Sequence, residues 1–239
     1  MIHVVTAENR AVYRRELAQM FAERAAFFID RLGWPLTCNG EGGEQDDHDD
    51  AEAIYFLVLD RAGEVSASCR ARPFAGGELL NGLVGVSTSA FQNSWELSRI
   101  MLSAPDRPWP PQVRPGELRL AVLEEAVERG IERLVGVVDA LHEAALMRSG
   151  YRIRSLGPRL KLGGGAVASF EIDARPEALS DLRRRLGLER ARRLRLPRVP
   201  AGGARPKEIE TFLQAARKLR PDQLTELRAA LRRAADEEN

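Results

Sequence analysis

The stretch that decides the fold is Ala53-Ile54-Tyr55-Phe56-Leu57-Val58-Leu59, an unbroken apolar run. A run of this length, rich in β-branched and aromatic residues, is typical of a buried strand. A turn that ends at Gly63 follows, and the chain returns from Glu64 to Arg72 as a second strand. The two strands together predict a β-hairpin.

Helices and strands are expected on both sides of this hairpin. Before it, the patterns predict a strand at 2–6, a helix at 8–32 ended by Gly33, and an acidic loop at 35–52. After it, they predict a strand at 95–102, a helix at 115–129, a strand at 133–138, a helix at 140–149, and strands at 151–155 and 167–172. This order predicts an α/β fold with a mixed sheet and helices on its faces.

Beyond Ile172 the chain changes in character. An arginine-rich segment is expected to form a helix or a pair of helices, and a Pro/Gly-rich linker follows it. The last segment has apolar residues at helical spacing, interrupted at Pro221, and predicts an αα-hairpin. The predicted divisions are a main domain at 1–175, a basic helical segment at 176–195, a linker at 196–206 and a hairpin at 207–239.

Composition limits the class of protein. The chain has 239 residues, 44% of them hydrophobic, and a net charge of +1, which does not indicate nucleic-acid binding. Its two cysteines make no disulfide framework. We find neither a signal peptide nor an apolar run near the ~20 residues that a membrane span needs. We therefore expect a soluble cytoplasmic protein.

The stretch Trp95-Glu96-Leu97-Ser98-Arg99 places a carboxylate, a hydroxyl and a guanidinium on an otherwise apolar strand. These groups cost desolvation energy unless polar partners meet them, so they belong either to a structural network or to a reacting cleft. Taken alone, the stretch favours the network. Strand alternation sends Glu96 and Arg99 to opposite faces, and a bulge near Ser98 would bring them together.

Residues of the same kinds precede this strand. They are Arg24, Phe28, Trp34, Asp46, Asp49 and Arg70. With the strand, they supply three arginines, three carboxylates and two aromatics. Carboxylates suit an ammonium or sulfonium, arginine suits a carboxylate, and aromatics suit a flat ring or an onium centre. The set therefore indicates a zwitterionic ligand with a flat ring.

The order and spacing of these residues resemble the LuxI-type acyl-homoserine lactone synthases, or autoinducer synthases. The matching pattern covers residues ~1–155 and reads Arg24-x3-Phe28-x5-Trp34, Asp46-x2-Asp49, Arg70-x2-Pro73, Glu96-x-Ser98-Arg99. The resemblance implies a GNAT-like three-layer sandwich with a mixed, mostly antiparallel central sheet, here with a C-terminal helical extension. It also implies synthesis of an N-acyl-L-homoserine lactone quorum-sensing signal from S-adenosylmethionine and an acyl thioester, with release of methylthioadenosine. Both molecules are substrates, and no cofactor is expected.

The resemblance also implies residue roles. Glu96 matches the candidate general base, which must remove a proton before the substrate amine can attack. The catalytic cluster comprises Ser98, Arg99, Asp46, Asp49 and Arg70. S-adenosylmethionine is expected to contact Arg24, Phe28, Trp34 and Asp46.

The acyl pocket is expected to include Met101, Val138 and Leu146. Val138 stands where members that accept 3-oxo chains often carry Thr. Because an aliphatic side chain cannot hydrogen-bond a 3-oxo group, an unsubstituted or branched acyl chain is expected.

Several residues have a plainer interpretation. The acidic run 46–50 lacks calcium-loop spacing, and the histidines form no zinc pattern with the cysteines, so no metal is expected. The C-terminal hairpin packs on its own chain or forms a homodimer. A solvated helix face is the plain interpretation of five arginines, and docking of an acyl-carrier protein or coenzyme A is the sharper one. These arginines are Arg183, Arg184, Arg185, Arg192 and Arg193.

Two other functions stay open. One is a GNAT-type N-acyltransferase that uses acyl-CoA on another amine, although no Arg/Gln-x-x-Gly-x-Gly/Ala loop precedes the helix at 115. The other is a non-catalytic protein that binds a thioester or a partner. The presence of Glu96, Arg99, Asp46 and Arg70 argues against a loss of catalysis.

Overall fold

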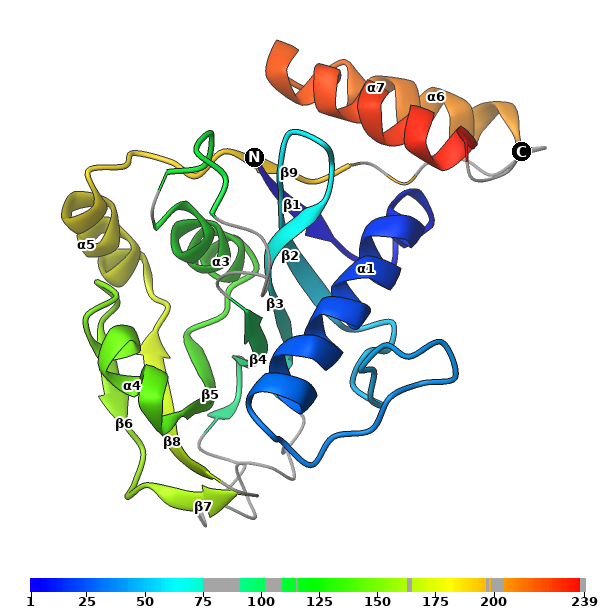
Figure 1. Ribbon diagram of the computed structural model, residues 1–239. Helices are drawn as coiled ribbons and strands as arrows, with labels where there is room; N and C mark the ends of the chain where they lie inside the picture. The colour runs from blue at the N-terminus through cyan, green and yellow to red at the C-terminus, as the bar shows by residue number, and fades with distance from the viewer. Residues whose placement is uncertain are drawn as a thin grey trace.

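The computed structural model describes residues 1–74, 91–101, 109–114, 116–162, 165–196, 198 and 204–236. Within them, one sheet has the strand order β6-β8-β5-β4-β3-β2-β1-β9, and β7 pairs with β8 (Figure 1). The strands are β1 (Ile2–Val5), β2 (Ile54–Leu59), β3 (Val65–Pro73), β4 (Ser94–Met101), β5 (Arg133–Asp139), β6 (Ile153–Ser155), β7 (Leu160–Leu162), β8 (Gly165–Asp173) and β9 (Arg193–Leu194).

The predicted hairpin lies inside this sheet. Strand β2 is buried along its whole length and pairs antiparallel with β3, so that Tyr55 lies opposite Arg70. Parallel pairing joins β4 to β5 and β1 to β9, and the other described strand pairs are antiparallel. The prediction of a mixed, mostly antiparallel sheet is therefore confirmed.

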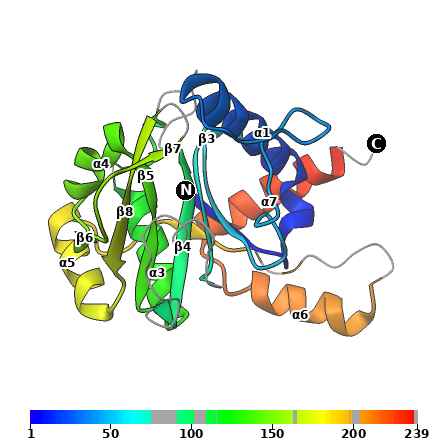
Figure 2. The same ribbon diagram turned by 90° about the horizontal axis from the view of Figure 1, so that it is seen from below.

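Helices cover both faces of the sheet, as Figure 2 shows. One layer contains α3 (Glu117–Glu128) and α5 (Pro176–Leu186), and the other contains α1 (Arg14–Arg24) and α7 (Pro221–Asp236). Alternate residues of β2 enter the two cores: Phe56 packs on the α3 side and Leu57 on the α1 side. The three-layer arrangement follows from a strand that is apolar on both faces.

Strand β4 contains a bulge, the feature that would bring Glu96 and Arg99 to one face. Arg70 lies opposite Ser98, but Ser68 lies opposite Met101, so β4 has one more residue than β3 between these pairs. Arg99 has a φ of 50°, which is uncommon for a residue other than glycine. The expected bulge is confirmed, and it reverses the alternation of side chains beyond it.

The pairing of strands β4 and β5 ends just before the bulge. Their described pairing runs from Ser94 to Leu97 on β4 and ends at Gly136 on β5. A Cβ atom at position 136 would lie 2.4 Å from the Leu97 carbonyl oxygen, so glycine allows the close approach at the last pair. Beyond this pair, Ser98 of β4 and Val138 of β5 both line a cavity.

Two helical predictions need correction. The helix expected at 8–32 is a 3-10 turn η1 (Arg10–Tyr13), then α1, then a π-helix η2 (Ala25–Arg31), and Gly33 follows with a φ of 64°. The helix expected up to residue 195 ends at Leu186, because Gly187 adopts the left-handed conformation that ends a helix. Strand β9 takes up the end of that segment instead. Strand β7 is an element that the sequence did not reveal.

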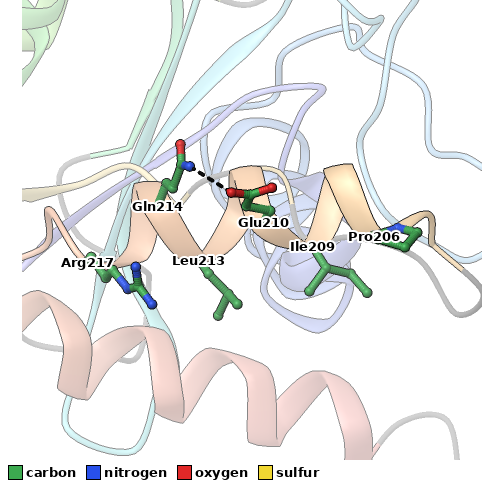
Figure 3. Close-up of a pocket in the computed structure, with 6 residues that line it drawn as sticks. All are labelled: Pro206, Ile209, Glu210, Leu213, Gln214 and Arg217. Atoms are coloured by element: carbon green, nitrogen blue, oxygen red, sulfur yellow. Dashed lines mark hydrogen bonds between the residues drawn. The ribbon is translucent and has the colours of Figure 1, made fainter.

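The C-terminal segment forms the predicted pair of helices, α6 (Pro206–Ala216) and α7. Residues 197 and 199–203 of the expected linker lie outside the described residues. Leu227 and Ala230 of α7 are buried against the α1 layer. In α6, Ile209 and Leu213 are 45% and 48% exposed and point to the same side, beside a hollow of about 380 Å³ (Figure 3). The homodimer stays a prediction.

In the described part of the chain, no helix combines the length and the apolar character that a membrane span requires.

A short helix, α4 (Ala140–Met147), joins β5 to the β6 edge of the sheet.

We predict that one ion pair holds α7 on the main body. Nε of Arg233 donates to Oε1 of Glu16 at 2.6 Å, and the Glu16 side chain is 2% exposed. Arg233→Ala would leave a buried carboxylate without its cation, so it should lower the free energy of unfolding by about 3–5 kcal/mol in urea denaturation. Arg232→Ala, which changes an exposed neighbour, should cost less than about 0.5 kcal/mol. Equal losses from the two variants would contradict this prediction.

Candidate active site

A cavity of about 730 Å³ lies where β4 and β5 part. Its polar wall includes Asp46, His48, Arg70, Glu96, Ser98 and Arg99. Its apolar wall includes Phe28, Trp34, Leu118, Val122, Val138, Leu146 and Ile172. The volume and the mixture of apolar walls with a few polar groups are typical of a small-molecule site.

Arginines of β3 and β4 fix one carboxylate at the cavity surface. Arg70 binds both oxygens of Asp46 and donates from Nε to the Ser98 hydroxyl at 3.0 Å. Arg99 also donates to Asp46, at 2.9 Å. The bulge at Arg99 makes this possible, because it turns the guanidinium toward the same loop that Arg70 contacts.

A second set of ion pairs lies behind the cavity. The Arg24 side chain is fully buried and donates to Asp49 through both terminal nitrogens, at 2.9 and 3.0 Å. Its Nε donates to Glu44 at 2.6 Å. The Tyr55 hydroxyl donates to Asp49 at 3.0 Å. Arg24 and Asp49 are not among the residues that line the cavity, so they lie beneath it, and the contact of Arg24 with a ligand stays a prediction.

Glu44 is the carboxylate that the sequence did not reveal. It is 1% exposed and accepts hydrogen bonds from both Arg24 and Arg99, at 2.6 to 2.9 Å. The acidic loop holds several carboxylates, and spacing alone does not distinguish Glu44 from its solvated neighbours. The available signal was the requirement that each buried guanidinium has a partner.

The carboxylates that arginines hold, Asp46 and Asp49, differ from Glu96 in the direction of their pKa shifts. Burial opposes ionisation of Asp46 and Asp49, but hydrogen bonds and charge from Arg70 and Arg24 hold the pKa of each below its usual range. Burial raises the pKa of Glu96, against the opposing charges of His48 and the arginines. Among the described residues, Glu96 has no hydrogen-bonding or ion-pair partner within its cavity wall, so its carboxylate is available to a ligand.

The π-helix supplies the aromatic wall. Phe28 lies in η2, and its ring centroid is 5.2 Å from that of Trp34, just beyond the helix. The Arg99 guanidinium lies 5.9 Å from the Phe28 centroid. Both residues line the cavity, so the aromatic residues predicted to contact a ligand are in place to do so.

The acyl-pocket prediction holds in position for two of its three residues. Val138 and Leu146 line the cavity. Met101 does not, because the extra residue in β4 turns it into the core on the α1 side, where it is completely buried. Regular alternation would place Met101 on the side of Leu97, and the bulge interrupts that alternation.

Four of the five arginines expected at a docking surface are paired within the chain. Arg183, Arg192 and Arg193 bind glutamates of α3, and Arg184 binds Asp181. The pairs of Arg183, Arg192 and Arg193 hold α5 and β9 against α3, and all four pairs reduce the charge that is free for a partner. No ion pair of Arg185 occurs within the described residues.

The described part of the chain contains no group of three or more His, Cys, Asp or Glu side chains arranged to hold a metal ion.

Sequence comparison connects this site to a known family. The autoinducer synthase family model matches residues 8–182. An acyl-homoserine-lactone synthase of Rhizobium etli is 30% identical over 190 residues, which cover 73% of this chain and 85% of that protein. An isovaleryl-homoserine lactone synthase of Bradyrhizobium diazoefficiens is 26% identical over 196 residues, which cover 79% and 86%.

Solved structures agree with this match. A CoA-dependent acyl-homoserine lactone synthase, MesI, is 27% identical with a TM-score of 0.66, covering 81% of this chain and 98% of that chain. The CoA-dependent synthase BjaI, solved with S-adenosylmethionine and isopentyl-CoA, has a TM-score of 0.69 at 21% identity, covering 90% and 99%. The expected GNAT-like fold is thus confirmed. The chain belongs to the autoinducer synthase family, that of the acyl-homoserine-lactone synthases.

Proposed function

We propose that the chain condenses S-adenosylmethionine with an acyl thioester to give an N-acyl-L-homoserine lactone and methylthioadenosine. The charge balance of the buried ion-pair network together with Glu96 carries this proposal. Three arginines (Arg24, Arg70, Arg99) meet three carboxylates (Glu44, Asp46, Asp49), so this network is neutral as a whole. Glu96 then adds one negative charge, which complements the net charge of +1 on S-adenosylmethionine with its ammonium, sulfonium and carboxylate.

The individual groups also suit this substrate. Asp46 is the network carboxylate that reaches the cavity surface, with 28% of its side chain exposed, and it can meet an ammonium or sulfonium. Phe28 and Trp34 offer flat faces for the adenine ring and for the sulfonium by cation–π attraction. Arg70 and Arg99 hold Asp46 in one orientation, which avoids reorganisation of the site during the reaction.

In the first step, Glu96 acts as the general base. It removes a proton from the ammonium, and the resulting amine attacks the thioester carbonyl. The new C–N bond forms and the C–S bond breaks, and the leaving thiolate takes up the second proton that the attacking nitrogen loses as it becomes an amide. The raised pKa of Glu96 brings its basicity closer to neutral pH, as an efficient general base requires.

In the second step, the substrate carboxylate attacks its own Cγ. The C–O bond closes the lactone ring, and the C–S bond to the sulfonium breaks with release of neutral methylthioadenosine. No proton is transferred in this step, and neither step requires a bound cofactor. The site contributes by holding the carboxylate and the sulfonium in line.

We further propose acyl-CoA as the acyl donor. MesI, at 27% identity, is a CoA-dependent synthase. A carrier protein would need free positive charge on the surface, and most of the candidate docking arginines are occupied by α3 glutamates and Asp181. Methylthioadenosine release separates this function from acylation of another amine, which forms no methylthioadenosine.

The role of Glu96 is tested by Glu96→Gln. The amide cannot take up the proton, so kcat for methylthioadenosine release should fall by about 10²–10⁴-fold. Binding of S-adenosylmethionine, measured by calorimetry, should change much less. Glu41→Gln, an exposed change in the acidic loop outside the cavity, should keep the wild-type rate. A near-normal rate for Glu96→Gln would remove Glu96 as the base.

The pH dependence follows from the same residue. Because burial raises the pKa of Glu96, the acid limb of kcat/KM should lie above the usual glutamate value of about 4.3. Activity is lost as pH falls through this pKa, since protonated Glu96 cannot accept a proton. Asp46 and Asp49 have lowered pKa values and stay ionised over this range. An acid limb at or below the ordinary glutamate range would contradict this assignment.

Val138 should select against 3-oxo chains. Its side chain lines the cavity and offers no hydrogen bond, so hexanoyl-CoA should be turned over in preference to 3-oxohexanoyl-CoA. Val138→Thr should raise the relative kcat/KM for the 3-oxo donor roughly tenfold by adding a hydroxyl. Val138→Ala removes bulk without adding a donor and should not. Preferred turnover of the 3-oxo donor by the wild type would sink the prediction.

A further inference from the structure

Arg119, in the first turn of α3, is a cavity residue that the proposed reaction does not use. Its side chain is half-buried and lines the cavity. Its Nε is shielded from solvent and has no hydrogen-bond partner among the described residues. A buried donor without an acceptor costs free energy, so the chain keeps this guanidinium at a cost.

The other cavity arginines do not share this property. Arg70 and Arg99 bind Asp46, and Arg99 also binds Glu44. Arg31 is exposed at the rim, and its guanidinium lies 5.7 Å from the centroid of the Phe27 ring. Within the described cavity wall, Arg119 is the arginine whose charge meets neither a carboxylate nor an aromatic face.

The surroundings of Arg119 restrict what it can bind. Leu118 and Val122 of the same helix line the cavity beside it, as do Val138 and Leu146, the two residues of the expected acyl pocket that reach the cavity. The Tyr151 hydroxyl is already used, because it donates to the backbone carbonyl of Arg119 at 2.9 Å. The Arg119 guanidinium therefore shares one cavity with these apolar walls, which Asp139, His142 and Ser149 also line.

We propose that Arg119 binds an oxygen-bearing group of the acyl chain, a carboxylate or a carbonyl at a carbon beyond C3. This inference rests on the proposed function and specifies its acyl donor. One guanidinium matches one carboxylate in charge and can bind it through two hydrogen bonds. A phosphate dianion of coenzyme A would be left with uncompensated charge between apolar walls. The acyl chain stays unsubstituted at C3, because Val138 offers no hydrogen-bond donor there.

The test compares three donors of equal length: hexanoyl-CoA, 5-oxohexanoyl-CoA and adipoyl-CoA. Methylthioadenosine release by the wild type should give a kcat/KM at least about tenfold higher for one of the two oxygen-bearing donors than for hexanoyl-CoA. The donor that gains identifies the group as a carbonyl or a carboxylate. Arg119→Leu should reverse this order, because an apolar side chain leaves the oxygen without a partner.

A matched control separates this effect from a general change in charge. Arg148→Leu removes an equal charge from an exposed position next to Ser149, outside the cavity lining, and should keep the wild-type order of donors. Arg119→Gln, which keeps a hydrogen-bond donor, should retain part of the preference. It also serves as the second variant if Arg119→Leu does not fold.

Thermal unfolding gives a readout independent of turnover. Without substrate, Arg119→Leu should melt at a higher temperature than the wild type, because it removes an unmatched, half-buried charge. The preferred oxygen-bearing donor should raise the wild-type Tm more than hexanoyl-CoA does. In Arg119→Leu this difference should vanish.

Three results would overturn the inference. A wild-type preference for hexanoyl-CoA that Arg119→Leu leaves unchanged would show that Arg119 does not read the acyl chain. Loss in Arg119→Leu of discrimination between hexanoyl-CoA and hexanoyl-pantetheine, without any oxygen preference, would assign Arg119 to the donor phosphates. Absence of methylthioadenosine release with every donor would overturn the proposed function itself, whereas release with hexanoyl-CoA alone would leave that function standing.

Discussion

The buried ion pairs of Arg24 are the interaction on which the site depends. Arg24 leaves α1 with no solvent contact and binds Glu44 and Asp49, which both belong to the acidic loop. Removing either carboxylate would leave a buried charge without its full set of partners, an arrangement that proteins tolerate poorly. The loop is therefore fixed to α1, and through Arg70 and Arg99 it is also fixed to β3 and β4. Asp46 reaches the cavity because the residues on either side of it are held in this way.

A single extra residue in β4 makes the strand fit this network. In a regular strand, Arg99 would face away from Glu96 and could not reach Glu44 or Asp46. The bulge and the positive φ of Arg99 bring the Glu96 and Arg99 side chains to one side of the strand. This backbone conformation costs conformational free energy. The arginine pairs described above offset that cost. The bulge directly follows the last described pair of β4 and β5. The ion-pair network and the opening of the cavity therefore begin at the same place in β4.

The sequence predicted the elements better than their ends. Apolar runs and glycine stops located the hairpin, α3 and the C-terminal helix pair, because burial and backbone freedom act locally. It could not separate Glu44 from other loop acids, since partner choice depends on where Arg24 and Arg99 meet in space. Met101 lies in the core on the α1 side for a related reason. The bulge in β4 changes the side to which its side chain points, and regular strand alternation does not predict a bulge. The helix or pair of helices expected at 176–195 is a single helix that ends before Gly187, whose left-handed conformation stops it.

Arginine content and arginine availability are different quantities in this chain. The sequence left the arginines of α5 and β9 as either a solvated helix face or a docking surface, yet Arg192 and Arg193 bind glutamates of α3 and hold β9 beside β1. Their charge contributes to cohesion. Arg119 is the opposite case. It belongs to no arginine-rich run, and it lines a cavity without a carboxylate partner among the described residues. A charge that the fold has already neutralised has little left to offer a ligand, whereas an unmatched one gains most from a ligand that supplies the missing partner.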